Sequence, residues 1–217
     1  MRKVVVIPGD GIGPEVIGSA LEVLRAVDAP LEITPAGMGL ACFKRTGSYL
    51  PSETLDVLQH SDAALFGAIT SPVTYDPSYR SPLLHLRKAF DLYANIRPVR
   101  RWHPSIGLVD LNVIIVRENT EGLYTGVERE DAEGVVTERR VTRKACQRIV
   151  DKGIEVCKAD GRGSITCVHK SNVLRRSDGL FREIFRERVG DSGLEGRELL
   201  VDAAAAAMFL QVLLLMF

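Results

Sequence analysis

Short apolar runs alternate with segments of helical periodicity along most of the chain. The first run, at residues 3–7, is β-branched and is typical of a strand that is buried on both faces. A helical pattern follows at about 14–26, with an apolar stripe on one side. Repeated alternation of this kind predicts an α/β protein with a largely parallel sheet. Further strands are expected at 31–35, 63–68, 113–116, 164–168 and 199–201, and further helices at 52–59 (with Ser52 as N-cap), 82–93, 142–157 and 178–187.

A glycine-rich turn, PGDGIGP at 8–14, lies between the first strand and the first helix. Such a turn can present backbone N–H groups to a phosphate. The spacing of Gly9, Gly11 and Gly13 does not fit the G-x-G-x-x-G fingerprint, and no P-loop Lys-Ser/Thr follows. The sequence therefore favours a structural turn and leaves a phosphate site as the alternative.

Three arginines lie in otherwise apolar sequence between residues 83 and 124: Arg87, Arg97 and Arg117. An arginine keeps its charge, and its planar fork matches a carboxylate. Three of them at the ends of apolar elements indicate a pocket for a small polycarboxylate. The alternative is that each pairs with a local acid, for which the candidates are Asp91, Glu118 and Glu121.

Polar residues also follow two of the predicted buried strands. Thr70 and Ser71 come after the strand at 63–68, at an edge where open α/β sheets tend to bind ligands. Lys170 directly follows the strand at 164–168, which makes it a candidate base or, alternatively, a snorkelling surface lysine. The charged segment at 128–140 predicts either an exposed hairpin or arm or a solvated loop.

Composition excludes some classes of function. The 217 residues are 46% hydrophobic and 26% charged, as in a globular protein with one large or two small domains. Lysine plus arginine balance aspartate plus glutamate at 28 each, so no basic field points to nucleic acid. The four cysteines are scattered without metal spacing, and the start is too short for a signal peptide. We therefore expect reduced thiols in a cytoplasmic protein.

Seven segments taken together resemble one enzyme family. They are VVVIPGDGIGPEV, LFGAITSP, LRKAFDLYANIRP, VIIVRENTEGLY, TRKACQRI, VHKSNVL and SDGLF, and they cover nearly all of residues 3–202. In this order they resemble the β-decarboxylating isocitrate, 3-isopropylmalate and homoisocitrate dehydrogenases, above all the archaeal-type branch. The resemblance implies an isopropylmalate-dehydrogenase-like two-lobed α/β fold. Residues 1–99 would begin the cofactor-side domain, and residues 100–202 would form the second domain, with an intersubunit arm at about 126–141.

The resemblance also implies roles for matching polar residues. The three arginines would grip the malate part of the substrate, including the carboxylate that leaves as carbon dioxide. Tyr124 would protonate the enol intermediate, and Lys170 would help to remove the hydroxyl proton during hydride transfer to NAD or NADP. Asp202 would be one ligand of a Mg or Mn ion, which stabilises charge on the ketone and enolate. Asn172 would lie near the substrate or nicotinamide, and Thr70 and Ser71 near the nicotinamide ribose and ring. In this family two subunits share each site, so a homodimer is expected.

The identity of the acid is less constrained. Residues before Arg87 would face the variable part of the substrate. Leu83 and Leu84 suit an apolar isopropyl group, whereas Ser81 suits the distal carboxylate of isocitrate or homoisocitrate. We favour 3-isopropylmalate, with the other two acids as alternatives.

The family pattern stops near residue 208. The run at 203–217, AAAAAMFLQVLLLMF, is shorter than the roughly 20 residues that span a bilayer, so we expect an aberrant apolar tail and no membrane anchor. The fold is expected to be incomplete at the C-terminus, because two further metal-binding aspartates and the adenosine-binding region of the family have no counterpart. The expected consequence is weak or absent dehydrogenase activity. The alternative is a non-catalytic fragment that binds a dicarboxylate or a partner subunit.

Overall fold

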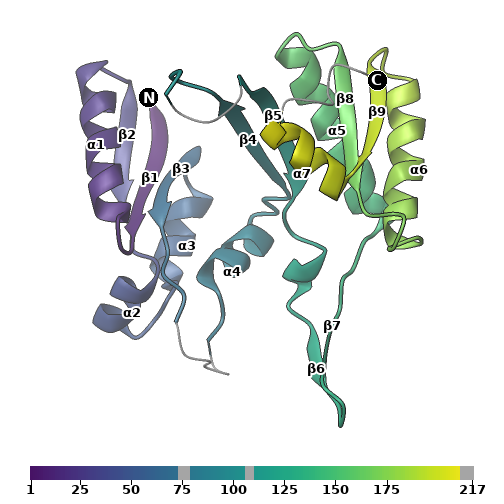
Figure 1. Cartoon of the computed structure of the whole chain (residues 1–217). Helices are drawn as coiled ribbons and strands as arrows, with labels where there is room; N and C mark the ends of the chain where they lie inside the picture. Colours follow the sequence, from purple (N-terminus) through teal and green to yellow (C-terminus); the bar gives the residue numbers. More distant parts are fainter. Residues whose placement is uncertain (73–78, 106–109, 211–217) are drawn as a thin grey trace. The chain divides into compact units, whose positions relative to one another are not determined.

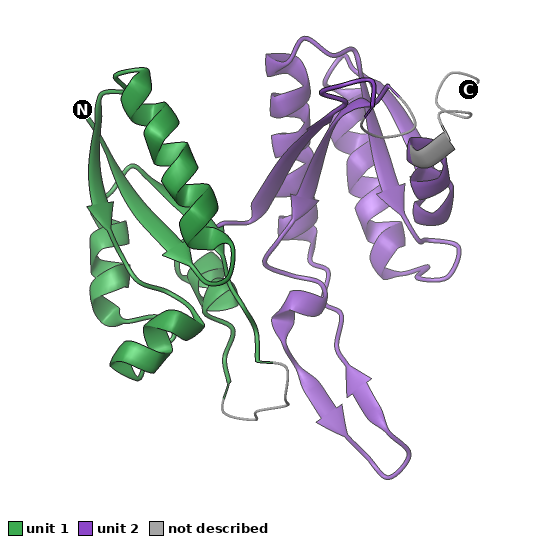
Figure 2. Ribbon diagram, turned by 60° about the vertical axis from the view of Figure 1, so that its left-hand side comes forward, with its two compact units in different colours: residues 1–90 green, residues 91–217 purple. Residues whose placement is uncertain are grey.

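The computed structural model of the protein describes residues 1–72, 79–105 and 110–210 (Figure 1). The chain divides into two compact units, Met1–Phe90 and Asp91–Phe217 (Figure 2). The sequence placed a domain boundary after residue 99, whereas the strand at 94–100 belongs to the second unit because it pairs there. The last seven residues of the apolar tail lie outside the described residues.

Unit 1 contains a three-stranded parallel sheet of order β2-β1-β3. Its strands are β1 (Arg2–Gly9), β2 (Leu31–Pro35) and β3 (Ala63–Ala68), and its helices are α1 (Gly13–Ala26), α2 (Leu40–Thr46), α3 (Ser52–Gln59) and α4 (Pro82–Ala89). Alternate β1 residues Val5 and Ile7 join Met38 and Leu86 in one core. Ile17 of α1 lies against Gly67 of β3, where a Cβ on the glycine would come 3.1 Å from the isoleucine side chain. Burial of these β-branched residues keeps β1 in the centre of the sheet.

Unit 2 combines an antiparallel and a parallel strand pair. The first pair is β4 (Ala94–Arg100) with β5 (Asn112–Glu118), and the second is β8 (Ser164–His169) with β9 (Glu195–Leu200). Helices α5 (Arg143–Ala159) and α6 (Ser177–Gly190) contact each other, and α7 (Val201–Leu210) follows β9. The core is formed by α5, β8 and α6, through Cys146, Val150, Cys167, Ile184, Phe185 and Val189. Thr142 caps α5, because its Oγ1 accepts a hydrogen bond from Ala145 N at 3.2 Å.

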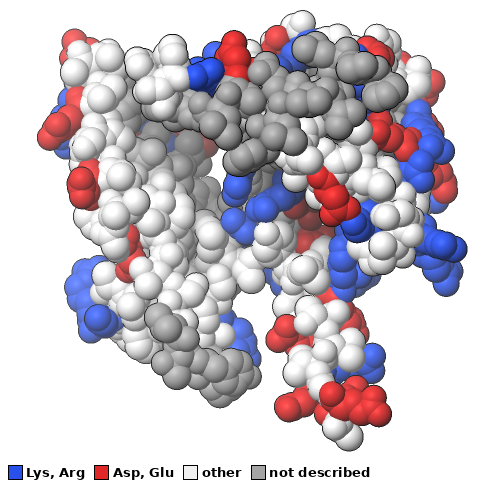
Figure 3. Space-filling view, in the orientation of Figure 1, with Lys and Arg blue, Asp and Glu red and all other residues white. Residues whose placement is uncertain are grey.

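The charged segment forms a hairpin of β6 (Glu128–Glu130) and β7 (Val135–Thr137), preceded by the 3-10 turn η1 (Leu123–Thr125). The hairpin interpretation is thus confirmed over the solvated loop. Acidic side chains gather at the hairpin tip, where Glu130, Asp131 and Glu133 are exposed (Figure 3). Val127 and Val135 of the same segment are exposed as well, at 46% and 65%.

Several local predictions were wrong at element ends. Ser52 does not cap α3, since Pro51 precedes the helix and no side-chain cap is formed. The helix expected at 82–93 ends at Ala89, and the chain turns at Asp91 with a left-handed φ of 46°. Helix α2 and strand β4 were not predicted. Glycines precede the short α2 segment, and β4 contains a proline, so neither shows a clear periodic pattern. Asp202 does not end a strand: β9 stops at Leu200, and Asp202 lies in the first turn of α7.

All four cysteines are buried free thiols, which confirms that none forms a disulfide. Among the helices of the described ranges, none is long and apolar enough to cross a membrane.

Candidate functional site

Two of the three predicted arginines lie on one face of the β4–β5 ribbon. Asn95 is directly opposite Arg117 in the register, and Arg97 is two residues from Asn95 on the same strand. Because side chains alternate between faces, all three share a face, and Arg97 and Arg117 are diagonal neighbours. Arg97 Nε donates to Asn95 Oδ1 at 2.7 Å, and Arg117 Nη2 donates to Asn119 Oδ1 at 3.3 Å. The ribbon thus presents two guanidinium groups together.

The local acids that might have neutralised these arginines are engaged elsewhere. Asp91 and Glu118 both accept from Arg148, at 2.7 Å and 3.2 Å. Glu121 accepts from the backbone N and the hydroxyl of Thr142, at 2.9 Å and 2.7 Å.

Neither Arg97 nor Arg117 forms an ion pair within the part of the chain that the structure describes. Arg117 Nε is buried and has no hydrogen-bond partner there. An unmatched buried donor on a permanent cation is costly, and an anionic ligand is one partner that would satisfy it.

Tyr124 lies beside Arg117, one of these two arginines. It belongs to η1, and the Arg117 guanidinium carbon is 5.6 Å from the centre of its ring. The turn is secured by an antiparallel bridge between Gly122 and Arg140, where Gly122 N donates to Arg140 O at 2.8 Å. Gly122 has a φ of 69°, a conformation that favours glycine. Tyr124 and Arg117 therefore form one local group in unit 2.

Helix α4 of unit 1 carries the residues predicted to contact the substrate tail. Leu83, Leu84 and Arg87 are spaced by three and four residues, so they are neighbours on one side of the helix, and all are half-buried. Ser81 is the N-cap, and its Oγ accepts from Leu84 N at 3.4 Å. The hydroxyl of Ser81 thus already has a structural partner, which sequence analysis did not anticipate.

Lys170 and Asp202 come together at the ends of the parallel strands β8 and β9. Lys170 follows His169, which pairs with Leu200 in the register, and Asp202 lies two residues beyond Leu200. Lys170 Nζ donates to Asp202 Oδ2, and this hydrogen bond holds the pKa of Asp202 below its ordinary value. Asn172 is exposed two residues after Lys170. The predicted base and the predicted metal ligand therefore occupy one site, although the lysine is bonded to the aspartate rather than isolated.

The glycine-rich turn contributes a buried carboxylate, Asp10, which is bound by backbone N–H groups from outside the turn. Asp10 is 6% exposed and accepts from Leu40 N at 2.9 Å, Ala41 N at 2.8 Å and Thr70 N at 3.0 Å. Burial raises its pKa, but the backbone hydrogen bonds outweigh that effect, and the pKa lies below the ordinary value. Gly9 and Gly13 are required by packing, since a Cβ would lie 1.8 Å from Ala68 O and 2.0 Å from Pro8 O, respectively.

The structural interpretation of the turn is therefore the one that the geometry supports. Two N–H groups of the turn are used within the fold: Asp10 N donates to Ala68 O at 2.8 Å and Gly13 N donates to Asp10 O at 2.9 Å. Through Thr70 N, Asp10 also secures the polar end of β3, where Thr70 and Ser71 are both exposed.

Sequence reasoning missed two residues that organise unit 2. Arg148 binds Asp91 with two hydrogen bonds, and its guanidinium carbon lies 4.5 Å from the ring centre of Tyr93. Asp178, 5% exposed, binds the backbone of Lys170. The signal for Arg148 was an arginine within the amphipathic α5 helix, and for Asp178 an acid in the first turn of α6. Neither signal distinguishes such residues from solvated ones.

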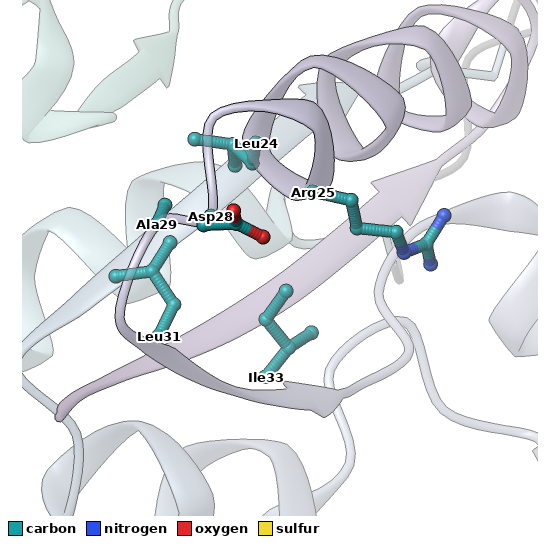
Figure 4. A pocket seen from close by; sticks show the side chains of 6 residues that line it. All are labelled: Leu24, Arg25, Asp28, Ala29, Leu31 and Ile33. Atoms are coloured by element: carbon teal, nitrogen blue, oxygen red, sulfur yellow. The ribbon is translucent and has the colours of Figure 1, made fainter.

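An open pocket in unit 1 lies apart from all of these residues. It is lined by Leu24, Arg25, Asp28, Ala29, Leu31 and Ile33, at the end of α1 and along β2 (Figure 4). None of the predicted site residues lines it. Within the described ranges, no three His, Cys, Asp or Glu side chains gather as a metal site, so Asp202 is a single candidate ligand and not a coordination shell.

Comparison with known proteins identifies the family of the chain. The model of the isocitrate/isopropylmalate dehydrogenase family matches residues 3–212. The homoisocitrate dehydrogenase of Methanocaldococcus jannaschii is 40% identical over 94% of this chain and 62% of that protein. The 3-isopropylmalate dehydrogenase of Methanothermobacter thermautotrophicus is 42% identical over 96% of this chain and 62% of that protein.

A solved structure gives the same answer for the fold. The isocitrate dehydrogenase of Methylococcus capsulatus superposes with a TM-score of 0.92 at 35% identity, over 97% of this chain and 64% of that chain. This confirms the predicted α/β class. The present chain spans a little over three fifths of the length of these relatives, and it belongs to the isocitrate/isopropylmalate dehydrogenase family.

Proposed function

We propose that the protein serves the metal-dependent oxidative decarboxylation of a 2-hydroxy-3-carboxy acid with NAD or NADP, and that the acid is 3-isopropylmalate. The observation that carries the proposal is the pair of guanidinium groups on one face of the β4–β5 ribbon. Their local acids are bound elsewhere, and Arg117 Nε is buried without a partner in the described residues. A small dianion satisfies both the charge and the unmatched donor.

Each candidate site residue has a proposed role in this reaction. Arg97 and Arg117 would orient the carboxylate that departs, with Arg87 as the third arginine from α4. The Tyr124 hydroxyl would donate a proton to the enol carbon, and Lys170 would accept the proton of the substrate hydroxyl. Thr70, Ser71 and Asn172 would lie at the nicotinamide end of NAD or NADP, which would supply the hydride acceptor. A Mg or Mn ion, with Asp202 as one ligand, would supply electrophilic stabilisation of the oxygen that becomes the ketone.

The proposed identity of the substrate tail is based on residues of α4 and its N-cap. Leu83 and Leu84 lie within one helical turn of Arg87. The Ser81 oxygen accepts from Leu84 N as a helix cap, which leaves its O–H free to donate, so the cap does not decide between the two kinds of tail. An apolar surface beside a carboxylate-binding arginine fits an isopropyl group better than a second carboxylate. Isocitrate and homoisocitrate are the alternative substrates, because relatives named for each acid match the chain at similar identity.

We propose further that the whole protein is a homodimer in which the hairpin contacts the partner. The 217 residues alone should bind metal and dinucleotide weakly, because the described residues supply one candidate metal carboxylate. The second candidate function is a non-catalytic module that retains the arginine face and binds a dicarboxylate or a partner subunit. The same unpaired Arg117 Nε supports it.

One experiment tests both candidates. Residues 1–202 would be joined to the C-terminal part of the Methanocaldococcus jannaschii relative, and NAD(P)H formation from the three acids would be measured with Mn²⁺. The same measurement would be made on the 217-residue chain, with calorimetric binding of each acid to it. The proposal expects the highest kcat/KM with 3-isopropylmalate in the joined chain. A joined chain that folds and oxidises none of the acids would overturn the enzyme proposal. Absence of dicarboxylate binding would remove the dicarboxylate-binding form of the second candidate.

A further inference from the structure

Lys170 stands just beyond the last hydrogen-bonded residue of β8, where the parallel ladder with β9 ends. Its backbone N–H is nevertheless bonded: it donates to Asp178 Oδ2 at 2.6 Å. Asp178 lies in the first turn of α6, and its side chain is 7% exposed. A buried carboxylate of the following helix thus replaces the strand partner that the Lys170 amide lacks.

The residues on either side of Lys170, His169 and Ser171, are also held by hydrogen bonds. His169 is 7% exposed, and its Nδ1 accepts from Ser171 N at 3.2 Å. Burial and then the charge of Arg182 lower the pKa of His169, which suits an accepting, neutral imidazole. Arg182 of α6 donates to Ser171 Oγ at 3.0 Å and is itself bound by Glu198 of β9 at 2.7 Å. The segment 169–171 is therefore fixed to α6 at two points.

The second oxygen of Asp178 reaches the base of the hairpin. Arg139 Nη1 lies 2.8 Å from Asp178 Oδ1. The residues adjacent to Arg139 secure the turn that carries Tyr124: Arg140 forms the bridge to Gly122, and Glu138 O accepts from Thr125 Oγ1 at 3.0 Å. Residues 138–140 thus contact the Tyr124 turn through the backbone, and the Arg139 side chain contacts Asp178, the partner of the Lys170 amide.

We propose that Asp178 is a positioning residue for Lys170, and that Arg139 links this restraint to the turn that carries Tyr124. The inference deepens the proposed function, because it matters for catalysis only if Lys170 acts on the substrate. A lysine ammonium sits on a flexible four-carbon stem, so the place of its backbone limits where Nζ can reach. Loss of the Asp178 carboxylate would leave the Lys170 amide without its partner and release the segment. Misplacement of a reacting group by about 1 Å can lower a rate by about 100-fold.

The test uses the 217-residue protein as it is. Two quantities would be measured: hydrogen exchange of the Lys170 amide by NMR, and the rate at which an amine-reactive ester labels Lys170, by mass spectrometry. Asp178→Ala should raise the exchange rate by at least about 10-fold and the labelling rate several-fold, because the amide bond is lost. Asp178→Asn keeps an acceptor for the amide and should stay within about threefold of the parent. Arg139→Gln should give a smaller increase than Asp178→Ala.

The matched control is Glu183→Ala, which removes the exposed pair between Arg143 of α5 and Glu183 of α6. It should leave both rates at Lys170 unchanged. If Asp178→Ala does not fold, Arg139→Gln carries the comparison. Unchanged exchange and labelling at Lys170 in a folded Asp178→Ala protein, or in Arg139→Gln where Asp178→Ala does not fold, would overturn the inference.

The joined enzyme separates this inference from the proposed function. There, Asp178→Ala should lower kcat at least about 10-fold with KM within about twofold, because only a group used in the chemical step has moved. Full activity of Lys170→Gln in the joined enzyme would overturn the proposed role of Lys170, whatever the exchange data show. Normal kcat of Asp178→Ala, in an enzyme that Lys170→Gln inactivates, would overturn the positioning role alone.

Discussion

Lys170 and Asp202 form an ion pair at the ends of the adjacent parallel strands β8 and β9. The side chains are 33% and 68% exposed, so the pair is open to solvent. The hydrogen bond from Lys170 lowers the pKa of Asp202, which keeps the carboxylate ionised and able to bind a cation. A metal at Asp202 would therefore have to share this carboxylate with the ammonium group.

Asp202→Asn should make Lys170 more reactive toward an amine-reactive ester, because the ammonium group loses its anionic partner. The labelling rate at Lys170, read by mass spectrometry, should rise at least about twofold. Glu155→Gln is the matched control: it removes the partner of Lys152 on α5, so it should change labelling of Lys152 and not of Lys170. Equal labelling of Lys170 in the parent and in Asp202→Asn would contradict the pair.

Arg117→Lys should weaken dicarboxylate binding by at least about 10-fold, because an ammonium group cannot reproduce the planar fork. Isothermal calorimetry with 3-isopropylmalate would measure it. Arg197→Lys is the control, since Arg197 pairs with Glu195 within β9 and should not affect binding. Retained affinity in a folded Arg117→Lys protein would argue against the guanidinium pair as the binding site.

Arg148→Ala should destabilise unit 2 by about 2 kcal/mol. The change removes two hydrogen bonds to Asp91, one to Glu118, and the contact with the Tyr93 ring. The free energy of unfolding in urea, followed by circular dichroism, would report the loss. Arg188→Ala breaks a more exposed pair with Asp151 and should have little effect, so similar losses in the two variants would refute the special role of Arg148.

Asp10→Asn should destabilise the protein at pH 7 and much less at low pH. The folded-state pKa of Asp10 is lowered, so its stabilisation is complete above the ordinary aspartate pKa of about 4 and is lost as the pH falls through the folded value. At pH 7 the loss should be about 2 kcal/mol, because an amide cannot accept from all three N–H groups. Unfolding midpoints at pH 7 and pH 3 would measure the difference. Exposed Asp56 on α3 is the control position, and an Asp10→Asn effect that does not change with pH would contradict the carboxylate role.

The buried thiols Cys146 and Cys167 should be nearly inert in the folded protein. Burial raises their pKa to about 11 and about 12, so the thiolate fraction at pH 8 is at least about 100-fold below that of an ordinary cysteine. Iodoacetamide labelling at pH 8 should be slow for both and should accelerate on unfolding in guanidinium. Equal rates before and after unfolding would show that the core around α5, β8 and α6 is open.

Local pattern in the sequence determined much of the fold. Short apolar runs predicted β1, β3 and β8, and the amphipathic segment ending near residue 157 predicted α5, because the spacing of apolar residues reflects which faces are buried. Patterning failed for α2 and β4. The former begins after Gly39, at φ 101°, and the latter contains Pro98, so tertiary pairing overrode weak local preference.

The sequence by itself also determined which residue types are available for chemistry: three arginines, Tyr124, Lys170 and Asp202. Only the tertiary structure decided how they are partnered. In the folded chain Asp91 and Glu118 pair with Arg148. Arg97 and Arg117 lie on one face of the β4–β5 ribbon, and Lys170 pairs with Asp202. The reason is physical: propensity and periodicity act between near neighbours in sequence, whereas ion pairing depends on distances in space, here between residues 30 and 57 positions apart.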